Sequence, residues 1–66
     1  MRVTVNGESR EVAVDTTVAA LVAMHDLPPQ HVAVEINYEL VPRRQFGETP
    51  LAEGDQIEIV TLVGGG

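Results

Sequence analysis

Residues 54–66 read "GDQIEIVTLVGGG", a strand pattern that continues without a break into three glycines. Ile57 and Ile59 alternate with Gln56 and Glu58, which predicts a strand with one face in a core and the other in solvent. Because this strand and the first strand of the chain both have an apolar face, they can pair in parallel at the centre of a sheet, with a helix in the crossover.

The outer face of this strand becomes apolar near its end. Continued alternation puts Val60 and Leu62 on the outer face and Thr61 on the inner face. Ala33, on an earlier strand, also points outward and extends the apolar patch. Two interpretations stay open: the patch docks on a partner protein, which we favour because it adjoins the glycines, or the strand twists and buries Leu62.

The remaining elements follow from periodicity and turn residues. Asn6-Gly7 predicts a hairpin turn after the first strand, and Val12 and Val14 are expected to point inward on the return strand. Pro28 and Pro29 end the helix. The predicted order is a strand over residues 1–6, a strand over 9–14, a helix within 15–29, a strand over 31–37, a short strand at 40–41 and the last strand over 56–63.

Three candidates, Asp15, Thr16 and Thr17, can cap the helix. Leu51 is expected to anchor a turn-rich stretch to the core. The pattern predicts an α+β roll, in which a mixed sheet carries one helix on one face. We expect one domain over residues 1–63 and a mobile glycine tail over residues 64–66.

Composition restricts the function. The chain has 66 residues and a net charge of -6, with ten acidic residues against four arginines, which argues against nucleic acid and fits docking on a basic partner surface. It has no cysteine, so no disulfide or thiolate metal site is expected. No apolar run is long enough to cross a membrane, and the first residues do not resemble a signal peptide, so we expect a cytoplasmic protein.

No constellation in the chain indicates catalysis. His25 and His31 lack further ligands at metal spacing, so we expect no metal site, with His25 half-buried and His31 on the surface. The carboxylates lie on solvated turns and strands, and a chain with one helix has little material for a cleft. Arg43 follows a proline and is expected to hold the irregular loop or to touch a partner, whereas Arg44 is expected to serve solubility. We do not expect an enzyme.

The three glycines have a physical use as a tail. Without side chains they form a narrow stem that fits a slot too tight for other residues. The only functional group at the end of this sequence is the carboxylate of Gly66, which becomes an acyl donor once a partner enzyme adenylates it. A frayed terminus is the competing interpretation, and the adjoining strand and patch argue for a substrate handle.

The whole chain resembles a ThiS-type sulfur carrier of the ubiquitin-like β-grasp family. The resemblance rests on "VTVNGE", "TTVAALVA", "VAVEIN", "LVPRRQF", "LAEGDQIEIV" and the final "LVGGG". It implies that a ThiF-type adenylyltransferase uses ATP and magnesium to adenylate Gly66, that sulfur from a cysteine desulfurase or rhodanese-like donor replaces AMP to give a thiocarboxylate, and that a ThiG-type thiazole synthase takes the sulfur for thiamine. One departure is His25, where related helices often carry leucine.

The resemblance also implies roles for individual residues. Gly64 and Gly65 thread the active site of a partner, Gly66 carries the sulfur, and the carrier itself binds no cofactor and is a monomer when free. We expect Val60, Leu62, Ala33 and Arg43 to dock on the partner. The alternatives are a sibling carrier for molybdopterin, cysteine or tRNA thiolation, a ubiquitin-like protein modifier, and an interaction module with an idle tail.

Overall fold

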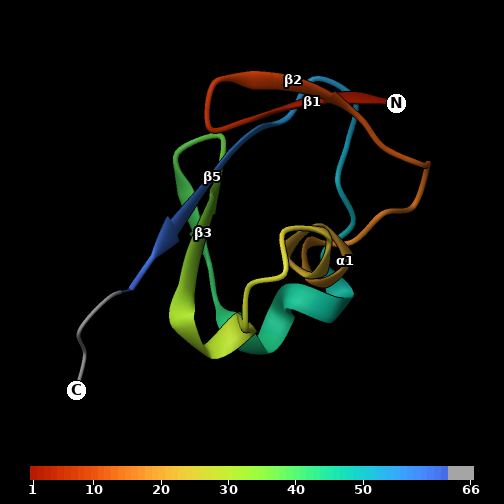
Figure 1. Cartoon of the computed structure of the whole chain (residues 1–66). Coiled ribbons are helices and arrows are strands. Elements are labelled where there is room, and N and C mark those ends of the chain that lie inside the picture. Colours follow the sequence, from red (N-terminus) through yellow and green to blue (C-terminus); the bar gives the residue numbers. More distant parts are fainter. Residues whose placement is uncertain (63–66) are drawn as a thin grey trace.

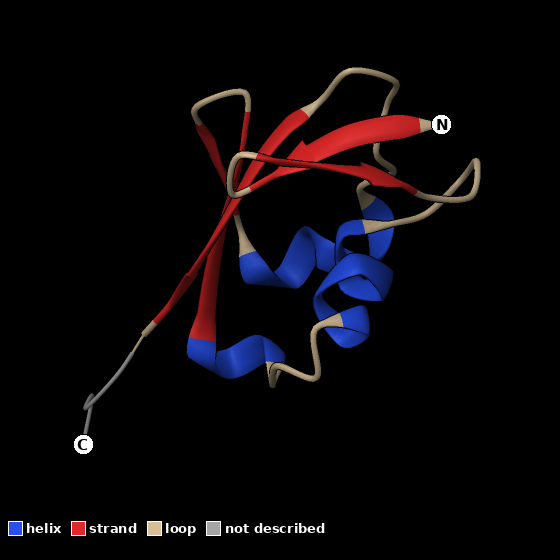
Figure 2. Ribbon diagram, turned by 45° about the horizontal axis from the view of Figure 1, so that its top comes forward, coloured by secondary structure: helices blue, strands red, loops and turns tan. Residues whose placement is uncertain are grey.

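In the computed structural model, which describes residues 1–62, five strands form one mixed sheet in the order β2-β1-β5-β3-β4. The single α-helix of the described residues packs on one face of this sheet, and two short 3-10 helices close the same side (Figures 1 and 2). The predicted α+β roll is therefore confirmed. The elements are β1 (Arg2–Val5), β2 (Glu8–Glu11), α1 (Val18–Met24), η1 (Pro29–His31), β3 (Val32–Ile36), β4 (Glu39–Val41), η2 (Arg43–Glu48) and β5 (Gln56–Thr61).

The last strand, β5, lies in the middle of the sheet. It runs parallel to β1, with Thr4 opposite Gln56 and Val5 opposite Ile57. On its other side it runs antiparallel to β3 over five residue pairs. The predicted parallel pairing of the first and last strands is confirmed, and Figure 1 shows β5 between the β1–β2 hairpin and β3.

Two hairpin turns have the same backbone form. Asn6 and Gly7 both have positive φ, 50° and 84°, and join β1 to β2. Asn37 and Tyr38 have φ of 52° and 70° and join β3 to β4. Positive φ at both central residues is the requirement of a type I′ turn, whose twist matches that of paired strands. The Asn6-Gly7 prediction is confirmed. Asn37-Tyr38 is a second turn of this kind; a turn between Glu35 and Glu39 was expected, but not its type.

Helix α1 is shorter than the predicted limits. Thr17 is its N-cap, and the Thr17 side chain accepts a hydrogen bond from the Ala20 amide at 3.2 Å. The helix ends at Met24, and Asp26, with φ of 55°, turns the chain before the prolines. Because proline at the start of a helix loses no hydrogen bond, Pro29 begins η1 instead of extending α1.

The core lies between the sheet and the helices. Ile57 and Ile59 of β5 are buried, as predicted, and so is Leu51, the predicted anchor. Phe46 of η2 is also buried, so the core contains one aromatic side chain among its aliphatic ones. The complete buried apolar set is Val3, Val5, Val12, Val18, Leu21, Val22, Val32, Val34, Phe46, Leu51, Ile57 and Ile59.

Two expected inward residues are instead exposed. Val14 is 73% exposed, because β2 ends at Glu11 and the chain leaves the sheet there. Ala13 then accepts two hydrogen bonds from Thr16, one from the amide and one from the hydroxyl. Thr61 is exposed as well, since it lies on β5 beyond the buried Ile59. Alternation predicts the face of a residue, but the core must extend that far to bury it.

Within residues 1–62, no helix is long and apolar enough to cross a membrane.

Candidate functional site

The outer end of β5 exposes apolar side chains, as the sequence predicts. Val60 of β5 is 51% exposed and Leu62, the residue after β5, is 49% exposed, whereas the inward residues Ile57 and Ile59 are buried. Ala33 of β3 lies directly opposite Val60 and is partly exposed. The interpretation in which a twist buries Leu62 is wrong.

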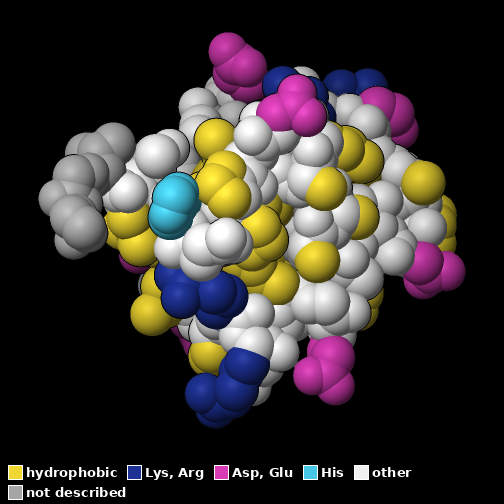
Figure 3. Space-filling model, turned by 60° about the horizontal axis from the view of Figure 1, so that its bottom comes forward, with side chains coloured by type: hydrophobic (Ala, Val, Ile, Leu, Met, Phe, Trp, Pro, Cys, Tyr) yellow, Lys and Arg dark blue, Asp and Glu magenta, His cyan; other side chains and the backbone are white. Residues whose placement is uncertain are grey.

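A shallow hollow brings three of the predicted docking residues together. Its volume is about 180 Å³ and its lining includes Ala33, Leu40, Pro42, Arg43 and Leu62. Leu40 of β4 is 66% exposed and was not identified as a candidate. We define the docking patch as Ala33, Leu40, Val60, Leu62 and the flanking Arg43. Figure 3 views the end of the molecule formed by η1 and η2, where arginine side chains lie beside hydrophobic ones.

Asn6 holds the middle of β5 from the β1 side. Its amide accepts a hydrogen bond from the Ile59 N–H at 2.8 Å and donates one to the Ile59 carbonyl at 3.3 Å. The backbone N–H of Asn6 also donates to the Ile57 carbonyl at 2.9 Å. The side chain therefore continues the parallel ladder past the end of β1, where the backbone has already turned away.

Asn37 has the matching role on the β3 side. Its backbone N–H donates to the Gln56 carbonyl at 2.7 Å, and its side-chain oxygen accepts from the Gln56 N–H at 3.0 Å. The side-chain nitrogen donates to Asp55 at 3.1 Å. Both type I′ turns thus place an asparagine amide against β5: Asn37 at Gln56, where the strand begins, and Asn6 at Ile59, further along it.

Beyond Ile59, β5 is paired only with β3 in the described residues. The pairing ends with a hydrogen bond of 2.7 Å from the Leu62 N–H to the His31 carbonyl. The predicted tail residues Gly64, Gly65 and Gly66, and the end of the predicted strand at Val63, lie outside the described residues. The domain division at residue 63 likewise stays a prediction.

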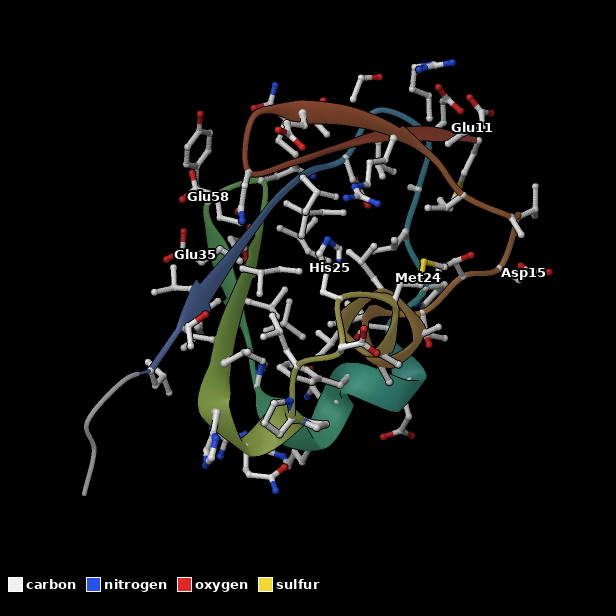
Figure 4. The ribbon with its side chains drawn as sticks, in the orientation of Figure 1. Glu11, Asp15, Met24, His25, Glu35 and Glu58 are labelled. Atoms are coloured by element: carbon white, nitrogen blue, oxygen red, sulfur yellow. The ribbon has the colours of Figure 1, made fainter. Side chains whose placement is uncertain are left out.

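Two carboxylates face each other on the outer face, next to the docking patch. Glu35 of β3 lies directly opposite Glu58 of β5. The Leu62–His31 and Asn37–Gln56 bonds mark hydrogen-bonded pairs of this ladder, and alternation makes Glu35–Glu58 another, with Cα atoms roughly 5.5 Å apart. Figure 4 shows both side chains on the side of the sheet away from α1. Like charges at such positions destabilise a sheet.

Arg43 reaches from the start of η2 to η1. Its Nε donates to the Pro29 carbonyl at 3.0 Å and its Nη2 donates to the Gln30 carbonyl at 3.2 Å. The prediction that Arg43 holds the irregular loop is therefore confirmed by contacts. Its contact with a partner stays a prediction, and Arg44 is exposed, as expected.

The two histidines are placed as predicted. His25 is half-buried at the end of α1, with Nδ1 2.9 Å from the Leu21 carbonyl, and His31 is exposed. In the described part of the chain, neither belongs to a group of three histidines or acids that could hold a metal ion.

The sequence carried signals for two features that were missed. Glu35 lies two residues after Ala33 on β3, so alternation places both on the outer face. The residue of β5 opposite Glu35 depends on the register of the two strands, which one strand alone does not reveal. The two Asn turns share an asparagine before a residue at positive φ. Gly7 made the first turn recognisable, whereas Tyr38 concealed the second.

Comparison with known proteins gives a consistent result. The ThiS family model matches residues 3–66. The sulfur carrier protein ThiS of Escherichia coli is 30% identical over the whole of both chains. A crystal structure of the thiamine biosynthesis protein ThiS from Geobacter metallireducens has a TM-score of 0.84 at 33% identity and covers both chains completely.

Other relatives are longer or more distant. A thiazole synthase from Paramagnetospirillum magneticum is 38% identical over all 66 residues, and the chain spans only 20% of its length. A ubiquitin-like protein from Caldiarchaeum subterraneum has a TM-score of 0.55 at 23% identity and covers 98% of this chain, which shows the fold alone. The fold is thus a ubiquitin-like β-grasp roll.

Proposed function

The chain belongs to the ThiS family, and we propose that it carries sulfur on Gly66 for the formation of the thiazole ring of thiamine. The observation that carries this proposal is the match of the family over residues 3–66, which includes the terminal glycines. The surface geometry supports it, because β5, which precedes those glycines in the sequence, carries the exposed Val60, and the exposed Leu62 follows it directly.

Thiazole formation is favoured over the sibling pathways by the longer relatives. Two thiazole synthases contain a segment, one fifth of their length, that is 38% and 39% identical to this whole chain. The simplest account of that match is that each of these longer proteins joins a carrier and the enzyme that consumes its sulfur in one polypeptide. We therefore propose a ThiG-type thiazole synthase as the acceptor partner.

The first chemical step activates an inert carboxylate. In the active site of a ThiF-type adenylyltransferase, a Gly66 carboxylate oxygen attacks the α-phosphorus of ATP, and the bond from that phosphorus to the pyrophosphate leaving group breaks. The products are the acyl-adenylate and pyrophosphate. ATP and magnesium belong to the partner, and Gly64 and Gly65 form the stem that enters its slot, since a glycine stem has the smallest cross-section.

The second step exchanges oxygen for sulfur. The terminal sulfur of a persulfide, held on a cysteine desulfurase or rhodanese-like donor, attacks the Gly66 carbonyl carbon and AMP leaves with the electron pair of the C–O bond. The product is an acyl disulfide that links Gly66 to the donor through two sulfur atoms. A thiol then attacks the sulfur that belongs to the donor. The S–S bond breaks, the thiol and donor form a disulfide, and the carrier is released as the thiocarboxylate. The two electrons come from the thiol.

The docking patch gives the partner a surface to recognise. Exposed apolar residues flanked by charge are typical of interfaces in which an apolar centre supplies affinity and charges supply orientation. We propose that Ala33, Val60 and Leu62 contact an apolar area of the partner, with Arg43 at the margin. Glu35 and Glu58, which form no ion pair within residues 1–62, fit a basic side chain on that partner.

No step of this chemistry requires a catalytic side chain on the carrier. We propose that catalysis resides in the partner enzymes and that the carrier is a substrate rather than an enzyme, acting in the cytoplasm where ATP is supplied.

Mass spectrometry tests the proposal. The purified chain is incubated with an adenylyltransferase, ATP, magnesium and a persulfide donor. The expected result is a mass gain equal to the replacement of one oxygen by sulfur. A variant without Gly66 is the control, and a gain that survives this deletion, or no gain in the intact chain, contradicts the proposal.

A genetic test separates the acceptors. Expression of the chain should restore growth of a thiazole auxotroph that lacks its own carrier, and should not restore a molybdopterin-deficient strain. The reverse result would retain the carrier chemistry and replace the acceptor.

A further inference from the structure

The side chain of Arg43 joins two segments that are distant in the sequence. Its Nε and Nη2 donate to two successive carbonyls, those of Pro29 and Gln30. A guanidinium is planar and presents its donors in a rigid fork, so two adjacent acceptors hold it in one orientation. Arg43 therefore ties η2 to η1 with a fixed geometry.

The next carbonyl of η1 holds the end of β5. His31 accepts the hydrogen bond from the Leu62 N–H at 2.7 Å, directly after the carbonyls that Arg43 contacts. Proline has no N–H, so Pro28 and Pro29 offer only carbonyls to their neighbours. The η1 turn itself is closed by the His31 N–H on the Pro28 carbonyl at 2.9 Å. The position of the His31 carbonyl thus depends on a short turn that Arg43 braces from outside.

We infer that Arg43 is a positioning residue for the reactive chain end. By holding η1, it keeps the His31 carbonyl where it binds Leu62 and so sets the point at which the chain leaves the sheet. This inference rests on the proposed function for its consequence, because the position of Leu62 matters only if Gly66 must reach a partner active site.

The point at which the chain leaves the sheet limits how far Gly66 can reach. Four residues follow Leu62, and four extended residues span at most about 14 Å. Release of one more residue from the sheet adds roughly 3.5 Å and lets the carboxylate occupy a larger volume. Because a misplacement of about 1 Å can reduce a rate by about 100-fold, we expect loss of the brace to lower kcat more than it raises KM.

Hydrogen exchange in the free carrier tests the brace without any partner. In Arg43→Ala, we expect the Leu62 amide to exchange at least about tenfold faster, since local opening removes its protection. Arg43→Lys should show the same change, because an ammonium keeps the charge but lacks the planar fork. Arg44→Ala is the matched control and should leave Leu62 unchanged. The Asn6 backbone amide, bonded to the Ile57 carbonyl of the central strand β5 at 2.9 Å, reports the global fold.

The outcomes separate positioning from other roles. An unchanged Leu62 amide in both Arg43 variants overturns the inference, and so does full recovery by Arg43→Lys, which would leave only a role for charge. Equal acceleration at Leu62 and Asn6 in Arg43→Lys also overturns it, because Arg43 would then stabilise the whole fold.

Kinetics of thiocarboxylate formation then test the consequence. With the Arg43→Ala carrier as substrate, we expect the kcat of thiocarboxylate formation by the partner enzymes to fall about tenfold, with a smaller change in the KM for the carrier. The Arg44→Ala carrier should give the same kcat and KM as the native chain. A change confined to KM shows that Arg43 acts by docking and overturns the positioning role. If the native chain forms no thiocarboxylate, the proposed function fails, whereas the exchange result still decides whether Arg43 braces Leu62.

Discussion

The two halves of the last strand place their apolar residues on opposite faces: Ile57 and Ile59 point into the core, whereas Val60 and the following Leu62 are exposed. From Gln56 to Ile59 the strand is held on both sides, by β1 and the Asn6 amide on one and by β3 and Asn37 on the other. From Val60 to Leu62, where the described residues end, only β3 accompanies it, and the apolar side chains are exposed. The first half is therefore a central strand of the core, whereas the second half behaves as an edge strand that presents a surface.

This difference separates stability from recognition along one strand. An apolar residue in the first half is buried by its own fold, so its truncation should be measured as a loss of unfolding free energy. A residue in the second half can be buried only by another protein, so its loss should be measured in binding. The following changes test that separation, from the largest expected effect on stability to the smallest.

Ile57→Ala should have the largest effect. Ile57 is 1% exposed, and truncation of a buried isoleucine removes transfer energy and leaves a cavity, which costs about 2–5 kcal/mol. Urea unfolding followed by circular dichroism measures the loss. Val60→Ala, on the same strand, is the control and should change stability by less than about 0.5 kcal/mol. Equal losses in the two variants would contradict the division of β5.

Asn6→Gly removes the side-chain amide from β5 while glycine retains the positive φ of the turn. The partly buried N–H and carbonyl of Ile59 lose their partner, so we expect a loss of about 1–3 kcal/mol in the same unfolding measurement.

Asn37→Gly is the matched variant for Asn6→Gly. It makes the same change at a turn of the same form, but water can replace the amide because its hydrogen bonds are exposed. We expect the loss to be smaller than that for Asn6→Gly. A larger loss at Asn37 would show that β3, not β1, provides the main support of β5.

Glu58→Gln should stabilise the fold slightly. It removes the repulsion between Glu58 and Glu35 across the strands, which is worth roughly 0.2–1 kcal/mol. The gain should shrink in unfolding experiments at high salt, because salt screens exposed charges. Glu48→Gln, on exposed η2, is the control. A destabilised Glu58→Gln would mean that the carboxylate has a favourable contact within the fold.

Leu62→Asp should have the smallest effect on stability, within about 0.5 kcal/mol, because half of its surface is already in water. Binding to the adenylyltransferase, measured by calorimetry, should weaken about tenfold or more, since a charge would enter the apolar centre of the interface. Val14→Asp adds the same charge at another exposed position and should bind normally. A severely unfolded Leu62→Asp would place Leu62 in the core.

Periodicity was sufficient to predict the sheet, the helix and the exposed patch. These features depend on local alternation, which the last strand shows clearly at Ile57 and Ile59. The positions of Val14 and Thr61 were wrong because alternation continues beyond the core that would bury them. The partners of Glu35 and Arg43 could not be predicted, since register and loop contacts depend on residues distant in the sequence.

The central place of β5 has a consequence for the order of events during synthesis. Its contacts with Asn6 span 53 residues, so the strand that joins the two halves of the sheet is translated long after the β1–β2 hairpin and α1. Contacts of such high sequence separation form late and slowly. A chain that stops before Gln56 lacks the middle of its sheet. Completion of the fold and synthesis of the strand that leads to Gly66 therefore coincide, and prematurely terminated chains should be unable to compete for the activating enzyme.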